Sequence, residues 1–213
     1  MALPPAPTAI RRAGALGALV AMVVFTWMIT AGSFDLFARQ HRAADFHEAQ
    51  ARSFLEGGWA VEPGVLGIEA FEIGDEEHTY FGIVPTLLRL PAVAVAGDEL
   101  DGRLTQVSML LAVGIGLAAL STTSWTIRWA RLGDQPLRRS DLAVAALVPF
   151  LGGTSAIVSF LASRPWVYHE AILWGAALSL GAFAALTRFL LGAGSRSLVV
   201  ASALALGALH SRA

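Results

Sequence analysis

Apolar blocks separated by short polar links make up most of the chain. A helix rises about 1.5 Å per residue and the hydrocarbon core of a bilayer is about 30 Å thick, so roughly 20 apolar residues are needed to cross it. Residues 13–31, 104–127, 142–162 and 167–186 meet that requirement. Residues 198–213 begin another apolar helix, and we expect a partial fifth span there. The pattern predicts an all-α integral membrane protein, a polytopic helix bundle with four to five transmembrane helices.

The polar segment of residues 32–103 is too long for a simple connection between the first two spans, so we expect it to fold on the membrane surface. Within it, residues 35–56 lack proline and glycine, Glu48 and Arg52 stand four positions apart, and Gly57 supplies a stop. These features predict a surface helix. Its apolar face would carry Phe37, Ala44, Ala51 and either Phe54 or Leu55.

The remainder of this segment predicts a small β-hairpin followed by an interfacial stretch. Residues 67–81 read GIEAFEIGDEEHTYF, in which two short apolar runs flank a Gly-Asp-Glu-Glu turn. In residues 80–97, Pro85 and Pro91 interrupt an apolar run that is too short to span. We therefore expect that run to lie in the membrane interface and to lead the chain into the second span.

The arginines set the expected orientation, because cytoplasmic loops of membrane proteins carry an excess of positive charge. Residues 1–12, 128–141 and 187–197 fall on one side of the predicted bundle. They hold Arg11, Arg12, Arg128, Arg131, Arg138, Arg139, Arg188 and Arg196. This pattern predicts a cytoplasmic N-terminus. Residues 32–103, with thirteen of the sixteen acidic residues and five arginines, then lie outside together with the short loop 163–166.

Two local features qualify the predicted spans. Residues 1–31 also fit a secretory signal peptide, with two arginines as the basic region and Ala31 as the small residue at a cleavage site. The apolar stretch is long for that purpose and further spans follow, which favours an uncleaved span. In the third span, Pro149 and the pair Gly152 and Gly153 predict a kink, which neighbouring helices can accommodate.

Composition narrows the possible functions. Hydrophobic residues account for 55% of the chain and charged residues for 15%, which is typical of a membrane protein. The net charge of −1 provides no basic field for nucleic acid. The absence of cysteine excludes disulfides, thiolate catalysis and cysteine-ligated metal sites.

Two short runs in residues 32–103 carry a family resemblance. The first has the pattern Ala-Arg-x-x-Leu-x-x-Gly-Trp and the second the pattern Tyr-Phe-x-x-x-Pro-x-Leu-Leu. Their residues are Ala51, Arg52, Leu55, Gly58 and Trp59, then Tyr80, Phe81, Pro85, Leu87 and Leu88. Together with the preceding span, residues 10–190 resemble the GT-C superfamily of polytopic glycosyltransferases. The likeness extends to lipid A aminoarabinose transferases, protein mannosyltransferases and uncharacterised actinobacterial membrane proteins.

This resemblance implies a bacterial plasma-membrane transferase that uses a polyprenyl-phosphate-linked sugar donor at the outer membrane face. A carboxylate in the first outer loop would act as general base, because an acceptor hydroxyl is a poor nucleophile until a base takes its proton. Asp45 is the candidate, upstream of the Ala51-Arg52 run. Asp35 and Glu48 remain alternatives, because a strict alignment from the Ala51-Arg52 run would place the acid nearer His41. The sequence also lacks the adjacent acidic pair that many relatives carry at this point.

A second cluster of candidate residues lies in SRPWVYHEA at the start of the fourth span. An ionisable pair inside a span is a functional candidate because its desolvation is costly, and His169 and Glu170 form such a pair. The resemblance implies that this region binds a divalent metal, with Asp45 as a further ligand, or the donor phosphate. Arg89 and Arg164 would pair with that phosphate. The alternative is that His169 and Glu170 anchor the fourth helix with Arg164.

Three function classes remain open from sequence. The first is a glycosyltransferase, or its N-terminal part, acting on a lipid-linked sugar. The second is a non-catalytic subunit or scaffold with membrane-protein partners. The third and weakest is a transporter, because no predicted span carries a charge at its centre and no inverted repeat is visible.

Overall fold

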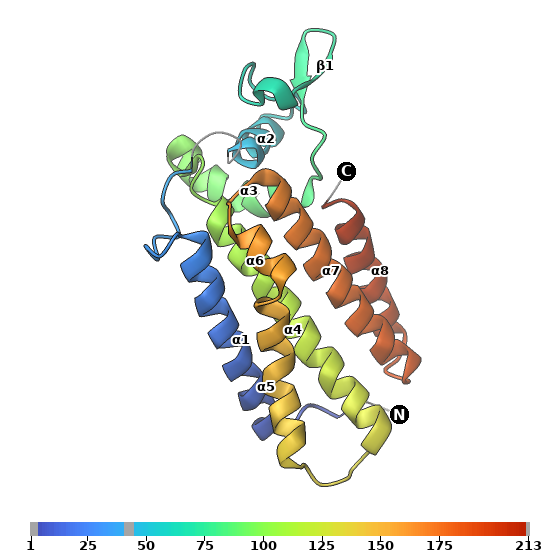
Figure 1. Cartoon of the computed structure of the whole chain (residues 1–213). Helices are drawn as coiled ribbons and strands as arrows, with labels where there is room; N and C mark the ends of the chain where they lie inside the picture. The colour runs from blue at the N-terminus through green and yellow to red at the C-terminus, as the bar shows by residue number, and fades with distance from the viewer. Residues whose placement is uncertain (1–3, 41–44, 212–213) are drawn as a thin grey trace.

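The computed structural model describes residues 4–40 and 45–211, which form a helical bundle capped at one end by a smaller polar layer (Figure 1). The bundle consists of α1 (Thr8–Ile29), α4 (Thr105–Leu132), α5 (Arg139–Gly153), α6 (Ala156–Ala162), α7 (Val167–Leu190) and α8 (Ser195–Leu209). The outer layer, as we name it, consists of α2 (Phe46–Leu55), β1 (Phe71–Ile73), β2 (Glu76–His78) and α3 (Val84–Ala96), with 3₁₀ turns at Gly67–Glu69 and Gly97–Leu100. The prediction of an all-α fold with a small hairpin is confirmed.

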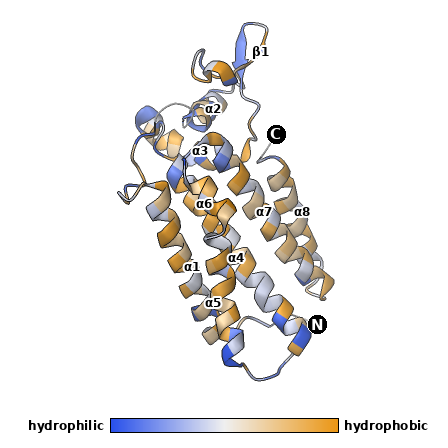
Figure 2. Cartoon of the chain, in the orientation of Figure 1, coloured by the Kyte–Doolittle hydropathy of each residue, from blue (hydrophilic) through white to orange (hydrophobic). Residues whose placement is uncertain are grey.

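Three helices, α1, α4 and α7, are long and apolar enough to cross a membrane. The pair α5 and α6 also qualifies if its two parts, bent by 44°, form one span. Figure 2 shows that hydrophobic residues dominate the bundle and that hydrophilic residues gather at its two ends. Many large side chains on the bundle remain exposed, which soluble monomers rarely show. Examples are Leu19, Val23, Leu111, Phe183 and Val199. This surface suggests a membrane environment.

The bend between α5 and α6 falls where the sequence predicts a kink. Gly152 and Gly153 end α5, and Ser155 begins α6 by accepting a hydrogen bond from the backbone N–H of Val158 at 3.4 Å. Consecutive glycines carry no side chains to support a helix, so they make the chain easy to bend. The predicted third span is therefore two helices.

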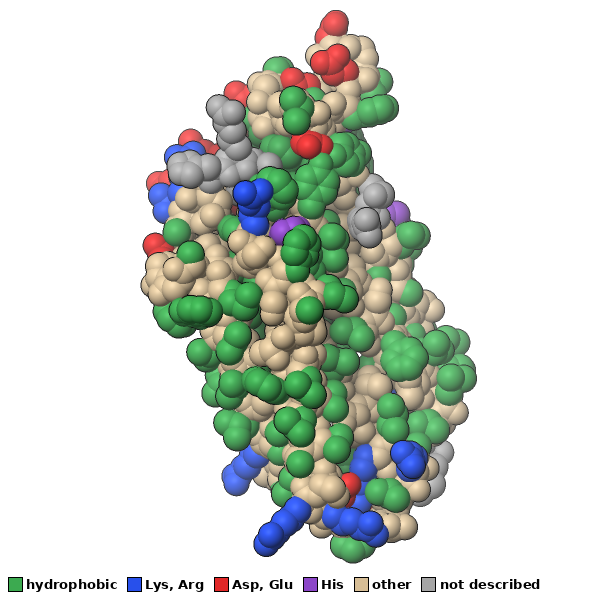
Figure 3. All heavy atoms as spheres, in the orientation of Figure 1, with side chains coloured by type: hydrophobic (Ala, Val, Ile, Leu, Met, Phe, Trp, Pro, Cys, Tyr) green, Lys and Arg blue, Asp and Glu red, His purple; other side chains and the backbone are tan. Residues whose placement is uncertain are grey.

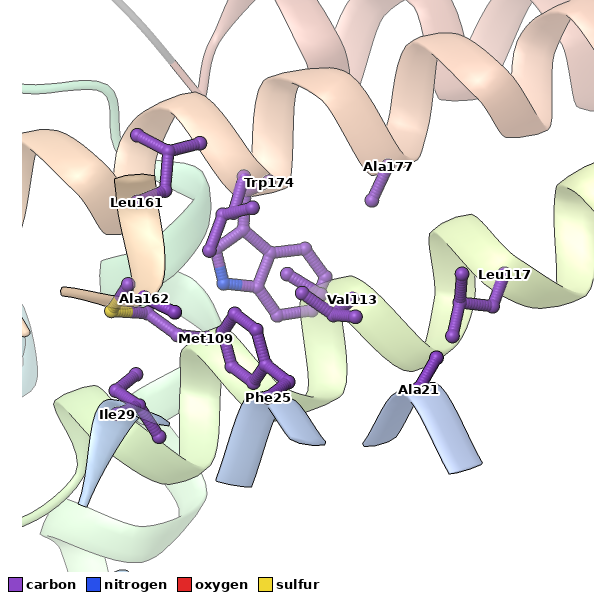
Figure 4. Close-up of a cluster of buried hydrophobic side chains, with 12 residues drawn as sticks. Ala21, Phe25, Ile29, Met109, Val113, Leu117, Leu161, Ala162, Trp174 and Ala177 are labelled. Atoms are coloured by element: carbon purple, nitrogen blue, oxygen red, sulfur yellow. The ribbon is translucent and has the colours of Figure 1, made fainter. Parts of the chain in front are cut away.

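The bundle core lies where α1, α4, α6 and α7 meet (Figure 4). Phe25, Met109 and Trp174 fill its centre, each at most 4% exposed. The Trp174 ring lies between α7 and α4, with Val113 beside it. Small residues such as Ala21 and Ala177 let the helix backbones approach closely around these larger side chains.

Helices α1 and α5 pack through small residues. A Cβ atom added at Gly17 would lie 1.9 Å from the carbonyl oxygen of Ala146, so only glycine permits this crossing. One turn earlier, a Cβ at Gly14 would lie 3.4 Å from the carbonyl oxygen of Ala145. This is the close backbone contact through which helices associate in membranes.

The prediction of a surface helix over residues 35–56 is wrong for residues 35–40, and residues 41–44 lie outside the described part of the chain. The described helix α2 begins only at Phe46. Upstream, Phe34 has a left-handed φ of +59°, and the Asp35 side chain accepts a hydrogen bond from the backbone N–H of Phe37 at 3.0 Å. That Asx turn offers the backbone an alternative to helical hydrogen bonds.

The predicted apolar face of this helix is only partly right. Ala51 is fully buried and Phe54, one of the two alternatives, is half-buried, but Phe37 and Leu55 are 53% and 50% exposed, and Ala44 lies outside the described residues. Glu48 and Arg52 are not partners, since Arg52 pairs with Asp101 at 2.5 Å. The helix is buried on several sides because the remainder of the outer layer and the end of α7 surround it.

The predicted hairpin is present, and the apolar run that follows it forms a helix. Strands β1 and β2 pair antiparallel, Phe71 opposite His78, around a two-residue turn in which Gly74 has a φ of +65°. In the apolar run that follows, the prolines do not prevent a helix, and α3 spans thirteen residues. Pro85 lies in its first turn, where the missing N–H would lack a helical partner anyway.

Candidate functional site

Three charged side chains from distant parts of the sequence meet at the junction between the outer layer and the bundle. Arg89 of α3 contacts both oxygens of Glu170, Nη1 to Oε1 at 2.6 Å and Nη2 to Oε2 at 2.8 Å. Its Nε lies 3.1 Å from Oε1 of Glu48 on α2. All three side chains are at most 3% exposed. We call Glu48, Arg89 and Glu170 the buried triad.

The triad continues into the bundle through hydrogen bonds. The Ser108 hydroxyl on α4 donates to Oε1 of Glu170, and the indole N–H of Trp174 donates to that hydroxyl at 2.9 Å. Arg89 also donates to the carbonyl oxygen of Pro85 at 3.1 Å. Glu170 is therefore held from both sides, by α3 and by α4, which suits a charge excluded from water.

A second buried chain of hydrogen bonds lies beside the triad. The Thr86 hydroxyl donates to Oε1 of Gln50 at 2.6 Å and lies 2.8 Å from Nδ1 of His47. A hydroxyl has one proton, so His47 must be the donor in the second contact. The neutral ring is then protonated on Nδ1, and its Nε2 is a bare acceptor.

Several buried acceptors at this junction receive no hydrogen bond from the described residues. They are Nε2 of His47 and both carboxylate oxygens of Glu48, whose contact with Arg89 is close but poorly aligned. Buried polar groups in proteins are nearly always hydrogen-bonded. Unused acceptors at one place therefore require an explanation, such as a bound molecule or a catalytic role.

Burial acts on the two neighbouring titratable groups in opposite directions. Burial raises the pKa of Glu48 from 4.5 to about 7, against the opposing attraction of Arg89. Burial lowers the pKa of His47 from 6.5 to about 4. Burial also opposes the charge on Arg89, but Glu170 and Glu48 outweigh it and raise its pKa, so Arg89 stays cationic.

The local sequence explains how α2 and α3 reach this junction. Helix α2 ends at Leu55, and its Arg52 ties it to Asp101 just before α4. The Phe46 ring packs against Phe81 with centroids 5.9 Å apart, in a small apolar cluster that also holds Val167 at the start of α7. That cluster aligns α2 with the first turn of α7, where Glu170 lies.

The predicted site residues are only partly brought together. Arg89 and Glu170 meet, whereas Arg164 is exposed and stacks over the ring of Trp166 at 4.4 Å. Nδ1 of His169 lies 2.8 Å from the carbonyl oxygen of Arg164, which helps to shape the turn before α7. Asp45 precedes α2 and is half-buried, one turn before Glu48.

From the sequence, Glu48 is only an alternative base, and no pattern singles out His47. No local pattern distinguishes Glu48 from the other carboxylates of the outer segment. The sequence carries one hint of this contact. Arg89 lies in an otherwise apolar run, and an arginine buried in an apolar helix needs a carboxylate partner. The sequence does not say which of thirteen carboxylates supplies it.

A second polar cluster lies on the exposed face of the outer layer. The Tyr80 hydroxyl donates to Oε2 of Glu69, and the Tyr168 hydroxyl donates to the same oxygen at 2.5 Å. Because both hydroxyls bind one carboxylate, the pKa of Glu69 is lowered. This cluster links the hairpin region to α7 at the surface.

In the described part of the chain, neither a group of metal ligands nor either of the two cavities described below surrounds the predicted residues. Within residues 4–40 and 45–211, no group of three or more His, Asp or Glu side chains is arranged to hold a metal ion. The structure thus does not gather Asp45, His169 and Glu170 as a metal site. Two cavities of about 920 and 860 Å³ lie along the bundle, and no triad residue lines either one.

No protein-family model matches the chain, and the searches of curated proteins and of solved structures found no match either.

Proposed function

We propose that this chain is a multi-pass membrane protein of a bacterial plasma membrane, with the outer layer on the external face and glycosyltransferase-like activity toward a polyprenyl-phosphate-linked sugar. The observation that carries the proposal is Glu48, a buried carboxylate whose pKa burial raises to about 7 and whose charged neighbour is Arg89, with Nε 3.1 Å from its Oε1. A base that titrates near the working pH is well suited to take a proton from an acceptor hydroxyl.

The position of Glu48 supports this role more than that of Asp45. Glu48 lies where the outer layer meets the bundle, which is where a lipid-linked donor and an external acceptor would meet. Arg89 would contact the donor phosphate only after its contacts with Glu170 and Glu48 open. Access requires α2 to move away from α3, since neither described cavity reaches the triad.

The proposal is tested with the native protein reconstituted in nanodiscs. A panel of radiolabelled polyprenyl-phosphate pentoses and hexoses is supplied with lipid and glycan acceptors, and transfer is counted. We expect Glu48→Gln to lower the rate by about 100-fold or more, as for loss of a general base. Asp45→Asn and the exposed hairpin control Glu72→Gln should stay within twofold of wild type.

Two outcomes contradict the assignment. Loss of transfer in Asp45→Asn with normal transfer in Glu48→Gln would return the role of base to Asp45. Normal transfer in both variants would remove Asp45 and Glu48 from the mechanism.

A second candidate, a non-catalytic subunit or scaffold, is favoured by a specific observation. Every charged group of the triad already faces an opposite charge, and the three side chains are sealed from water. A purely structural role is sufficient for such a buried triad, because its ion pairs hold the outer layer on the bundle. Under this alternative no donor sugar is transferred, and Glu48→Gln changes the thermal stability alone.

A further inference from the structure

The cavity of about 920 Å³ lies at the end of the bundle opposite the outer layer. Its walls come from α1, α4 and α5, and small residues of α1, including Gly14, Ala15 and Ala18, leave the space between the helices. A cavity of this size is within the range of ligand sites in proteins. Its position is distinct from the buried triad.

The rim of this cavity is cationic. Arg11, Arg131 and Arg188 come from the ends of three helices, α1, α4 and α7, and line the same space. In the described part of the chain, Arg131 and Arg188 form no ion pair, and Arg11 contacts only the Thr8 hydroxyl at 3.4 Å. Figure 3 shows arginine side chains gathered at this end of the molecule.

The acidic residue at the cavity does not neutralise these arginines. Asp141 is 3.5 Å from Nη2 of Arg128 and accepts a hydrogen bond from the backbone N–H of Arg138 at 2.9 Å. Arg128 is further occupied by the carbonyl oxygens of Gly133 and Gln135. Both partners are used within the turn between α4 and α5, so the rim keeps three uncompensated positive charges.

We infer that this cavity binds one anionic phospholipid, with its phosphate among Arg11, Arg131 and Arg188 and an acyl chain against the small residues of α1. A free anion would pair with the arginines of the rim but leave the apolar walls uncovered, whereas a neutral lipid would cover the walls but leave the arginines unpaired. An anionic lipid can contact both. Basic pockets between helices at one membrane face bind such headgroups. The inference shares with the proposed function only the placement in a membrane.

The chain offers a matched control for the arginines. Arg12, Arg139 and Arg196 are exposed at the same end of the bundle, and none of them lines the cavity. The triple variant Arg11→Gln, Arg131→Gln, Arg188→Gln and the triple variant Arg12→Gln, Arg139→Gln, Arg196→Gln therefore lose the same total charge. They differ only in whether the lost charges surround the cavity.

The experiment uses the native protein in phosphatidylcholine nanodiscs into which phosphatidylglycerol is titrated, with the rise in Tm as the signal. We expect the cavity triple variant to bind phosphatidylglycerol at least tenfold more weakly than wild type. The control triple variant should stay within twofold. Equal weakening in both variants would overturn the inference, because it would show a diffuse attraction of basic residues for an anionic surface.

Two further experiments test whether the cavity binds a lipid rather than a free anion, and whether the bound lipid contacts the apolar walls. Inorganic phosphate at millimolar concentration should not displace phosphatidylglycerol; displacement would overturn the inference in favour of a free-anion site. Ala15→Trp fills the cavity and should weaken binding at least tenfold without any change of charge, whereas Leu16→Trp, at a neighbouring exposed position outside the cavity, should not. Unchanged binding in Ala15→Trp would also overturn the inference.

Discussion

At the scale of single residues, His47 and Glu48 are neighbours that respond to pH with opposite signs. Folding keeps a proton off His47 between pH 4 and 6.5, so its contribution to stability rises with pH through that window. Folding keeps a proton on Glu48 between pH 4.5 and 7, so its contribution falls as pH rises. Over the shared window the two contributions oppose each other.

We predict that substitutions will separate these contributions. Glu48→Gln removes the falling contribution, so the Tm of the variant should rise from pH 4.5 to 6.5 more steeply than that of wild type. His47→Asn removes the rising contribution, and the Tm of this variant should fall from pH 4.5 to 7. Each effect should amount to about 3 kcal/mol, because the pKa of each group differs by about 2.5 between its ordinary value and its value in the folded protein.

Thermal unfolding of the purified protein across this pH range checks the prediction. The exposed hairpin residue Glu72 is the control, since Glu72→Gln should reproduce the wild-type profile. Parallel profiles for all four proteins would mean that His47 and Glu48 do not titrate in these windows.

Sequence reasoning selected Arg89 and Glu170 but could not foresee that they neutralise each other. The two residues are 81 positions apart, and their approach depends on how α3 packs against α7. Both were expected to face a ligand, whereas their side chains are already satisfied. Glu48 was harder still, because one buried carboxylate among many on a polar segment carries no local signature.

At the scale of elements, the sequence pattern predicted the helices of the bundle and the small hairpin, but it missed where α2 begins and did not predict α3. Long apolar blocks leave few alternatives, since every backbone group must find a partner within its own helix. In the outer segment, an Asx turn at Asp35 competes with a helix, and Pro85 lies in the first turn of a helix that the sequence pattern did not predict. Such choices depend on single hydrogen bonds, which composition does not reveal.

The crossing of α1 and α5 yields a prediction at this scale. Gly17→Ala should destabilise the bundle by about 2 kcal/mol or more, because the new methyl group would overlap the backbone of Ala146. Gly114→Ala on α4 is the matched control. Its methyl group would meet only the flexible end of Met22 at 3.3 Å, and alanine favours a helix over glycine.

Thermal unfolding of the two variants in the same detergent measures this difference. We expect a lower Tm for Gly17→Ala and an unchanged or higher Tm for Gly114→Ala. Similar losses in both would show that the close approach of α1 to Ala146 is absent in solution.

At the scale of the whole molecule, charge is divided between the two ends. Acidic side chains gather on the outer layer, and arginines gather where α4, α5, α7 and α8 are joined (Figure 3). If the bundle crosses a membrane, the arginine end should face the cytoplasm. This division of charge could be predicted from the sequence, because the division depends only on the order of spans and loops.

Cysteine labelling tests the orientation directly, because the chain contains no cysteine of its own. A membrane-impermeant maleimide should label Glu76→Cys and Arg164→Cys on intact cells. Asp134→Cys, in the exposed link between α4 and α5, should react only after permeabilisation. Labelling of Glu76→Cys and Arg164→Cys from opposite sides would contradict the shared compartment on which the proposed function depends.

The buried triad also constrains the order in which the protein can assemble. During translation, Arg89 is synthesised 81 residues before Glu170. Until α7 has been made and inserted, the guanidinium lacks its bidentate partner and must remain hydrated. The outer layer can therefore settle onto the bundle only after a nascent chain has been extended past α7, which makes its docking a late step of biogenesis.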